Sequence, residues 1–155
     1  MKKTLIIFSL VFLLFQSCSN KKNEIKGNWS AIIGDGSYME FYFHGDTVEP
    51  YDAMFKLWKG LSFKQTDDSL FINNVGYKII PQDNDLILLY SQKDSMKMAP
   101  ISDQENTLEK LIKNGLTDEN LDIEKRFELL NTFHNDHFLI RESEFLKRNI
   151  TNSKN

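Results

Sequence analysis

Residues 37–43 read Ser-Tyr-Met-Glu-Phe-Tyr-Phe, and this stretch decides the fold class. Side chains alternate between the two faces of a β-strand, so Met39, Phe41 and Phe43 are expected to share one face. The opposite face would carry Tyr38, Glu40 and Tyr42. One wholly apolar face beside a mixed one is typical of a strand that covers a core with one side.

The same alternation recurs on both sides of this stretch, between turn-forming residues such as Asn73-Asn74. Eight strands are predicted, over residues 28–33, 37–43, 53–58, 61–66, 69–73, 76–81, 85–90 and 94–99. In the later ones, Val75, Tyr77 and Ile79 are expected to share a face, as are Leu86, Leu88 and Tyr90. Short turns between strands require antiparallel pairing, and closure into a barrel would remove exposed edges. A barrel over residues 25–100 is therefore predicted, within a mainly β fold.

The hydrophobic spacing becomes helical in residues 101–155. Leu108, Leu111 and Ile112 predict a first helix that stops at Gly115. A second helix is predicted from the apolar spacing of Ile123, Phe127, Leu130 and His134, with Thr117, Asp118 and Asn120 as candidate N-caps. Residues 137–149 are predicted as a third helix capped by Asp136, with a final strand as the alternative. A C-terminal extension of two or three helices follows.

The N-terminus has the order of a secretory signal. Lys2 and Lys3 precede a short apolar run over residues 5–15, and the small residue Ser17 precedes Cys18. The run is far shorter than the roughly 20 residues that span a bilayer, which disfavours a transmembrane helix. Cys18 is the only cysteine, so it cannot form an intramolecular disulfide. An ordinary secretory signal with an incidental cysteine is the alternative.

The stretch Phe15-Gln16-Ser17-Cys18 resembles the lipobox of bacterial lipoproteins. The resemblance implies that residues 1–17 are a signal peptide, that the Cys18 thiol carries a lipid such as palmitate, and that residues 18–24 are a tether. Ser19 is not acidic, which by the sorting rule of that family implies the outer membrane, and we expect the periplasmic face. More than one acyl chain gives stable anchoring.

Gly27-Asn28-Trp29 resembles the Gly-x-Trp motif that opens the lipocalin barrel, and residues 35–38 are also similar to small lipocalin-like domains of bacterial lipoproteins. The resemblance covers about residues 24–100. It implies that Gly27 and Trp29 are structural, with the indole closing one barrel end. It also implies an apolar pocket. The candidate ligand-binding residues are Phe41, Phe43, Trp58, Tyr77 and Tyr90.

Composition and motifs exclude several function classes. The chain has 22 acidic and 19 basic side chains, and an acidic balance argues against a nucleic-acid partner. It has no nucleophile elbow, phosphate-binding loop or dinucleotide fingerprint, so we expect neither an enzyme nor a cofactor. His134 and His137 are spaced so that they could hold a metal, but a solvated helix junction is the better interpretation, and no metal site is expected.

Three functions remain open. The leading hypothesis is a membrane-anchored lipoprotein that binds a small hydrophobic ligand, which predicts an enclosed cavity of several hundred Å³ lined by Phe and Tyr. The alternative is an inhibitor, immunity protein or assembly factor with an envelope protein partner, which predicts a filled barrel and an apolar exterior patch. An envelope hydrolase comes third, because no convergent set of titratable residues is visible.

Overall fold

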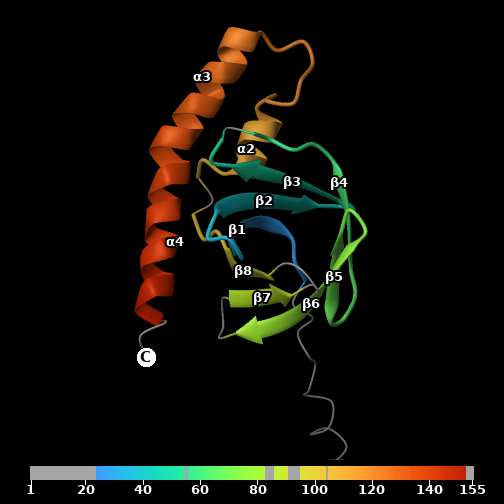
Figure 1. The fold of residues 1–155 in the computed structure, drawn as a ribbon. Coiled ribbons are helices and arrows are strands. Elements are labelled where there is room, and N and C mark those ends of the chain that lie inside the picture. The colour runs from blue at the N-terminus through green and yellow to red at the C-terminus, as the bar shows by residue number, and fades with distance from the viewer. Residues whose placement is uncertain (1–23, 55, 83–85, 91–94, 104, 153–155) are drawn as a thin grey trace, which may run out of the picture.

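The computed structural model describes residues 24–54, 56–82, 86–90, 95–103 and 105–152 (Figure 1). Eight antiparallel strands form a closed barrel in which each strand pairs with the next along the chain and β8 pairs with β1. The strands are β1 (Gly27–Ile33), β2 (Tyr38–His44), β3 (Thr47–Asp52), β4 (Leu61–Gln65), β5 (Ser69–Ile72), β6 (Val75–Gln82), β7 (Leu86–Tyr90) and β8 (Ser95–Pro100). The predicted barrel with C-terminal helices is confirmed.

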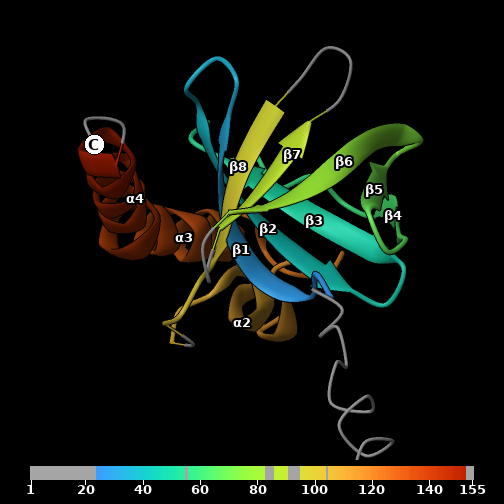
Figure 2. The same ribbon diagram turned by 90° about the horizontal axis from the view of Figure 1, so that it is seen from below.

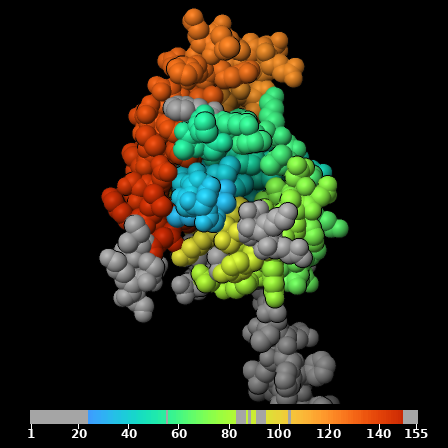
Figure 3. Space-filling view, viewed as in Figure 1, coloured from blue at the N-terminus to red at the C-terminus, as the bar shows by residue number. Residues whose placement is uncertain are grey.

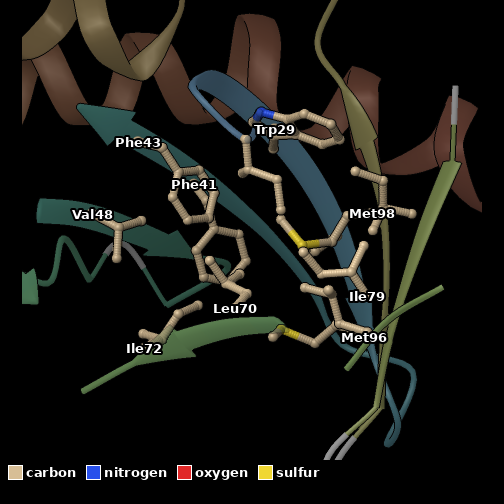
Figure 4. Packing of buried hydrophobic residues seen from close by; sticks show 13 residues of the cluster. Trp29, Phe41, Phe43, Val48, Leu70, Ile72, Ile79, Met96 and Met98 are labelled. Atoms are coloured by element: carbon tan, nitrogen blue, oxygen red, sulfur yellow. The ribbon is translucent and has the colours of Figure 1, made fainter. Parts of the chain in front are cut away.

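The β2 strand has the orientation that its sequence predicts. Phe41 and Phe43 are buried inside the barrel and Met39 packs against the same cluster, whereas Tyr38 faces outward beneath the helices. Inside the barrel these side chains meet buried residues of the other strands except β4, whose Leu61 and Phe63 are partly buried against them. Figure 4 shows buried members of this core. The buried members of this core are Ile25, Trp29, Ala31, Phe41, Phe43, Val48, Leu70, Ile72, Ile79, Ile87, Leu89, Met96 and Met98.

The predicted third strand was wrong. The chain uses Thr47–Asp52 for β3, and of residues 53–58 Leu57 forms an isolated bridge to Tyr51. Proline in a strand normally removes a ladder hydrogen bond, yet β3 contains Pro50. The Pro50 carbonyl accepts from the Trp58 N–H at 2.8 Å, away from β2. The Pro50 nitrogen lies on the same side of the strand as this carbonyl, so β3 loses no hydrogen bond to β2. On that side, β3 pairs with β4 only at Thr47 and Val48.

The predicted phase of β7 was also wrong. Ile87 and Leu89 point into the core, and Tyr90 is exposed on the outer surface. The segment Leu-Ile-Leu-Leu-Tyr contains no charged residue to mark its outer face, so alternation alone could not set the phase. Pairing with β8 sets it, because Ile87 lies opposite Met98 and Leu89 opposite Met96, both buried.

Two helical segments lie outside the barrel (Figure 2). The short helix α2 (Leu108–Lys113) begins after Thr107, whose hydroxyl accepts from the Lys110 N–H. The N-caps predicted for the next helix were wrong. The carboxylate of Asp122 accepts from the N–H groups of Glu124 and Lys125 and so starts α3 (Ile123–Phe133).

The second and third predicted helices are one continuous helix. After α3 come a π-helical turn, η2 (His134–Phe138), and α4 (Leu139–Asn152). We call residues 123–152 the long helix. Asp136 lies inside the π turn and is not a cap, and the alternative of a final strand was wrong. Within this turn the Asn135 side-chain amide donates to the Asn131 carbonyl at 3.0 Å, and the helix continues.

Candidate functional site

A cleft of about 720 Å³ opens at the end of the barrel where the chain enters β1. Three segments form it: the approach to β1, the β2–β3 turn and the end of β4 with the turn that follows. Its lining residues are Glu24, Ile25, Lys26, Phe43, His44, Gly45, Asp46, Phe63, Lys64, Gln65, Thr66 and Asp67. This volume lies within the roughly 300–1,000 Å³ typical of small-molecule sites.

The floor of the cleft is apolar and continuous with the barrel core. The rings of Phe43 and Phe63 meet edge to face with centroids 5.2 Å apart, and Ile25 is buried beside the same cluster. The Ile25 N–H donates to Oε1 of Gln65 at 2.8 Å, which ties the chain entering β1 to β4. The two sides of the cleft are therefore held together before any ligand arrives.

The rim of the cleft is charged but carries no dominant sign. Lys26 and Lys64 line it together with Glu24, Asp46 and Asp67. Nζ of Lys26 lies 3.1 Å from Oε2 of Glu24, in an exposed ion pair. A ligand that reaches this rim with a polar end would find both donors and acceptors above an aromatic floor.

His44 stands at the rim of the cleft. Its Nε2 lies 2.7 Å from Oε2 of Glu49 and 3.2 Å from Oγ1 of Thr47. The ring also stacks on Tyr42 with centroids 4.8 Å apart. These contacts fix the β2–β3 turn beside the cleft.

The structure brings together only part of the predicted ligand-binding set. Phe43 lines the cleft, Phe41 is buried in the core beside it, and Tyr77 packs against that core. Trp58 and Tyr90 are exposed on the outside, where Nζ of Lys56 lies 3.4 Å from the Trp58 ring centroid. Sequence reasoning missed Phe63, although the alternation in residues 61–66 marks it as the inward residue. The cleft is open and contains no tyrosine, unlike the enclosed cavity that was predicted.

The Gly-x-Trp residues lie at the same end of the barrel as the cleft. Trp29 is buried in the core, and its Nε1 donates to the Lys26 carbonyl at 2.9 Å. Gly27 has φ of +75°, which a residue with a side chain rarely adopts. The chain thus turns back over the indole just before β1 begins. Cys18, the predicted lipid site, lies outside the described residues.

The two histidines of the possible metal motif are directed differently. Nδ1 of the buried His134 lies 3.1 Å from the Tyr51 hydroxyl, whereas His137 is half-buried against Phe133. Among the described residues, no group of three or more His, Cys, Asp or Glu side chains is placed to hold a metal ion. The described part of the chain also has no helix long and apolar enough to cross a membrane.

A buried ion pair joins the long helix to the outer face of the barrel. Nε and Nη2 of Arg141 donate to the two carboxylate oxygens of Glu40 at 2.7 and 2.9 Å, and the Tyr38 hydroxyl donates to Oε1 at 2.9 Å. Burial, followed by the charge of Glu40, raises the pKa of Tyr38, so the phenol stays protonated as a donor. Around this pair lies a second apolar cluster. Its buried members are Tyr38, Tyr51, Ala99, Leu108, Leu111, Leu116, Phe133, Phe138 and Phe145.

The long helix lies along one side of the barrel (Figure 3). It also carries apolar residues that the barrel does not cover. Ile123 and Phe127 are 80% and 65% exposed, and Leu139 and Ile140 are also exposed. Single exposed apolar residues are common, but Ile123 and Phe127 lie one turn apart on the same helix face, so these two mark a candidate interaction surface.

Comparison with known proteins identifies no relative. No family model, curated protein or solved structure matches the chain.

Proposed function

We propose that the protein is a lipid-anchored lipoprotein of the bacterial cell envelope whose lipocalin-like barrel binds a small hydrophobic ligand, without enzymatic activity. The observation that carries the proposal is the cleft over Phe43 and Phe63. The barrel interior behind it is filled by side chains of the core. The ligand therefore sits at the barrel end, with its apolar part on the half-buried Phe63 ring and any polar end at the rim, because Phe43 is only 1% exposed and supports Phe63 from the core.

The sequence pattern at Cys18 supports anchoring, and the position of the cleft fits it. Six residues, 19–24, separate Cys18 from Ile25, which lines the cleft. Six extended residues span at most about 20 Å. A lipid on Cys18 would thus keep the cleft close to the membrane surface, which we propose is the periplasmic face of the outer membrane.

Ligand binding is tested by placing a charge on the cleft floor. Phe63→Arg is expected to weaken binding of the neutral hydrophobic dye N-phenyl-1-naphthylamine at least tenfold, because the guanidinium would occupy the cleft and make its floor polar. The measurement is a fluorescence titration of the full chain solubilised in mild detergent. Phe71→Arg is the matched control, since Phe71 lies exposed on β5 outside the cleft. Equal dye binding by wild type and Phe63→Arg would contradict the proposal.

Anchoring is tested separately. Cys18→Ala is expected to abolish incorporation of labelled palmitate and to move the protein from the membrane fraction to the soluble fraction, because the thiol that receives the lipid is lost. Ser19→Ala is the control and should keep both label and membrane association. Unchanged fractionation of Cys18→Ala would show that a lipid on this residue does not hold the protein at the membrane.

A second candidate function is a non-enzymatic interaction lipoprotein, and the exposed apolar residues of the long helix favour it. A partner seated there would cover Phe127, which is 65% exposed. A photocrosslinking residue at position 127 should then capture one defined envelope protein, whereas the same residue at position 75, exposed at the start of β6, should not. Equal crosslinking from both positions would count against a specific partner.

A further inference from the structure

A buried histidine lies where the long helix packs against the barrel. His134 opens the π turn, and its Nδ1 lies 3.1 Å from the hydroxyl of Tyr51 on β3. Its ring stacks on Phe138 with centroids 5.1 Å apart and meets the Tyr51 ring at 6.2 Å. A neutral imidazole fits this aromatic setting, because it can accept from the tyrosine without bringing a charge into the interface.

A protonated ring would fit poorly. Burial lowers the pKa of His134, and the negative charge of Glu142 on α4 raises it only in part. On the barrel side, burial raises the pKa of the neighbouring Tyr51, and the negative charges of Asp52 and Glu40 raise it further. The Tyr51 hydroxyl therefore stays protonated and supplies no compensating anion. The charge of Glu40 is paired with Arg141.

We propose that protonation of His134 weakens the docking of the long helix on the barrel, so that the His134–Tyr51 contact makes helix opening acid-sensitive. Opening exposes the outer aromatic face of the sheet around Tyr38 and Tyr51, while the helix stays attached through the chain that follows β8. The device is independent of the proposed cleft, which lies at the end of the barrel where the chain enters β1 and shares no lining residue with the helix.

The direction of the pH dependence follows from linkage. A released His134 has an ordinary pKa near 6.5, and the docked ring has a lower one. The released state therefore binds more protons, and docking weakens as pH falls below about 6.5. Until pH reaches the lowered pKa of the docked ring, the docking equilibrium shifts by up to about tenfold per pH unit.

The test is hydrogen exchange of the full chain in detergent, compared at pH 7.5 and pH 5 after correction for intrinsic rates. Peptides from residues 123–152 should lose protection at pH 5, while those from β1 and β2 keep it. His134→Gln, which cannot be protonated, should remove the acid response. His137→Gln is the matched control and should respond like wild type, because His137 is half-buried and does not contact Tyr51.

Two results would overturn the proposal: no acid response in the wild type, or the same response in His134→Gln. If His134→Gln fails to dock at pH 7.5, the wild-type chain still decides the matter. Its His134 ring, followed by NMR, should titrate over the same pH range in which helix protection falls. Loss of protection without titration of His134 would show that another group is responsible.

Discussion

Arg141→Met is expected to lower the free energy of unfolding by about 3–5 kcal/mol, as measured by urea denaturation at pH 7. Glu40 is fully buried and the Arg141 side chain is 14% exposed, so removing the guanidinium leaves a carboxylate without its bidentate partner. The Tyr38 hydroxyl would remain as a donor to that carboxylate. One hydrogen bond from a neutral phenol does not replace two from a cationic guanidinium.

The control for this substitution is Arg148→Met, on the same helix. Arg148 is 71% exposed and lies 3.8 Å from Glu144, so its loss should cost less than about 0.5 kcal/mol. The double variant Glu40→Met with Arg141→Met should recover most of the lost stability, because it removes both buried charges together. A cost below about 1 kcal/mol for Arg141→Met alone would contradict the geometry of this pair.

The ion pair between Glu40 and Arg141 could be predicted from the sequence only in part. Alternation in β2 correctly predicted that Glu40 lies on the face opposite Phe41 and Phe43. That face was not expected to be buried, because its partner Arg141 lies 101 residues further along the chain. No local pattern connects two positions so far apart, and only the docked helix turns a mixed strand face into an interior one.

The two strand errors have a common physical cause. Local patterns placed the third strand at residues 53–58 and could not decide the phase of Leu86–Tyr90, whereas pairing with neighbouring strands decides both. A proline is tolerated where its nitrogen faces away from the strand that it pairs with. In a uniformly apolar strand, pairing with the neighbouring strand decides which side chains face the core. Hairpin turns such as Asn73-Asn74 were predictable, because both residues adopt positive φ there and Asn tolerates it.

Of the predicted ligand-binding residues, only Phe43 lines the cleft, and the place of the cleft was not predicted. The resemblance to lipocalins implied an apolar site inside the barrel. The core fills that interior, so the open volume lies at the barrel end, where the approach to β1 meets β4. Whether side chains fill a barrel depends on its closure and on their combined volume, which no short motif encodes.

The second large loss of stability is expected for a substitution of Phe138, which lies in the π turn. Phe138→Ala is expected to cost about 3–5 kcal/mol in urea denaturation followed by circular dichroism, since a buried aromatic side chain is replaced by a cavity. The Phe138 ring is fully buried and lies 5.0 Å from the Tyr38 ring and 5.1 Å from the Tyr51 ring, both edge to face. One truncation therefore removes contacts to two barrel strands.

The neighbouring residue gives the matched control, because the π turn ends between them. Leu139 is 41% exposed, so Leu139→Ala should cost less than about 1 kcal/mol. Equal costs at the two positions would mean that the helix does not face the barrel through Phe138. Because Phe138 packs the long helix on the barrel, the stability lost in Phe138→Ala should appear first as faster amide hydrogen exchange in residues 123–152. The aromatic contacts around Phe138 hold the helix to the barrel, so the helix should detach first. The barrel keeps its own core and should unfold at a higher urea concentration than the helix detaches.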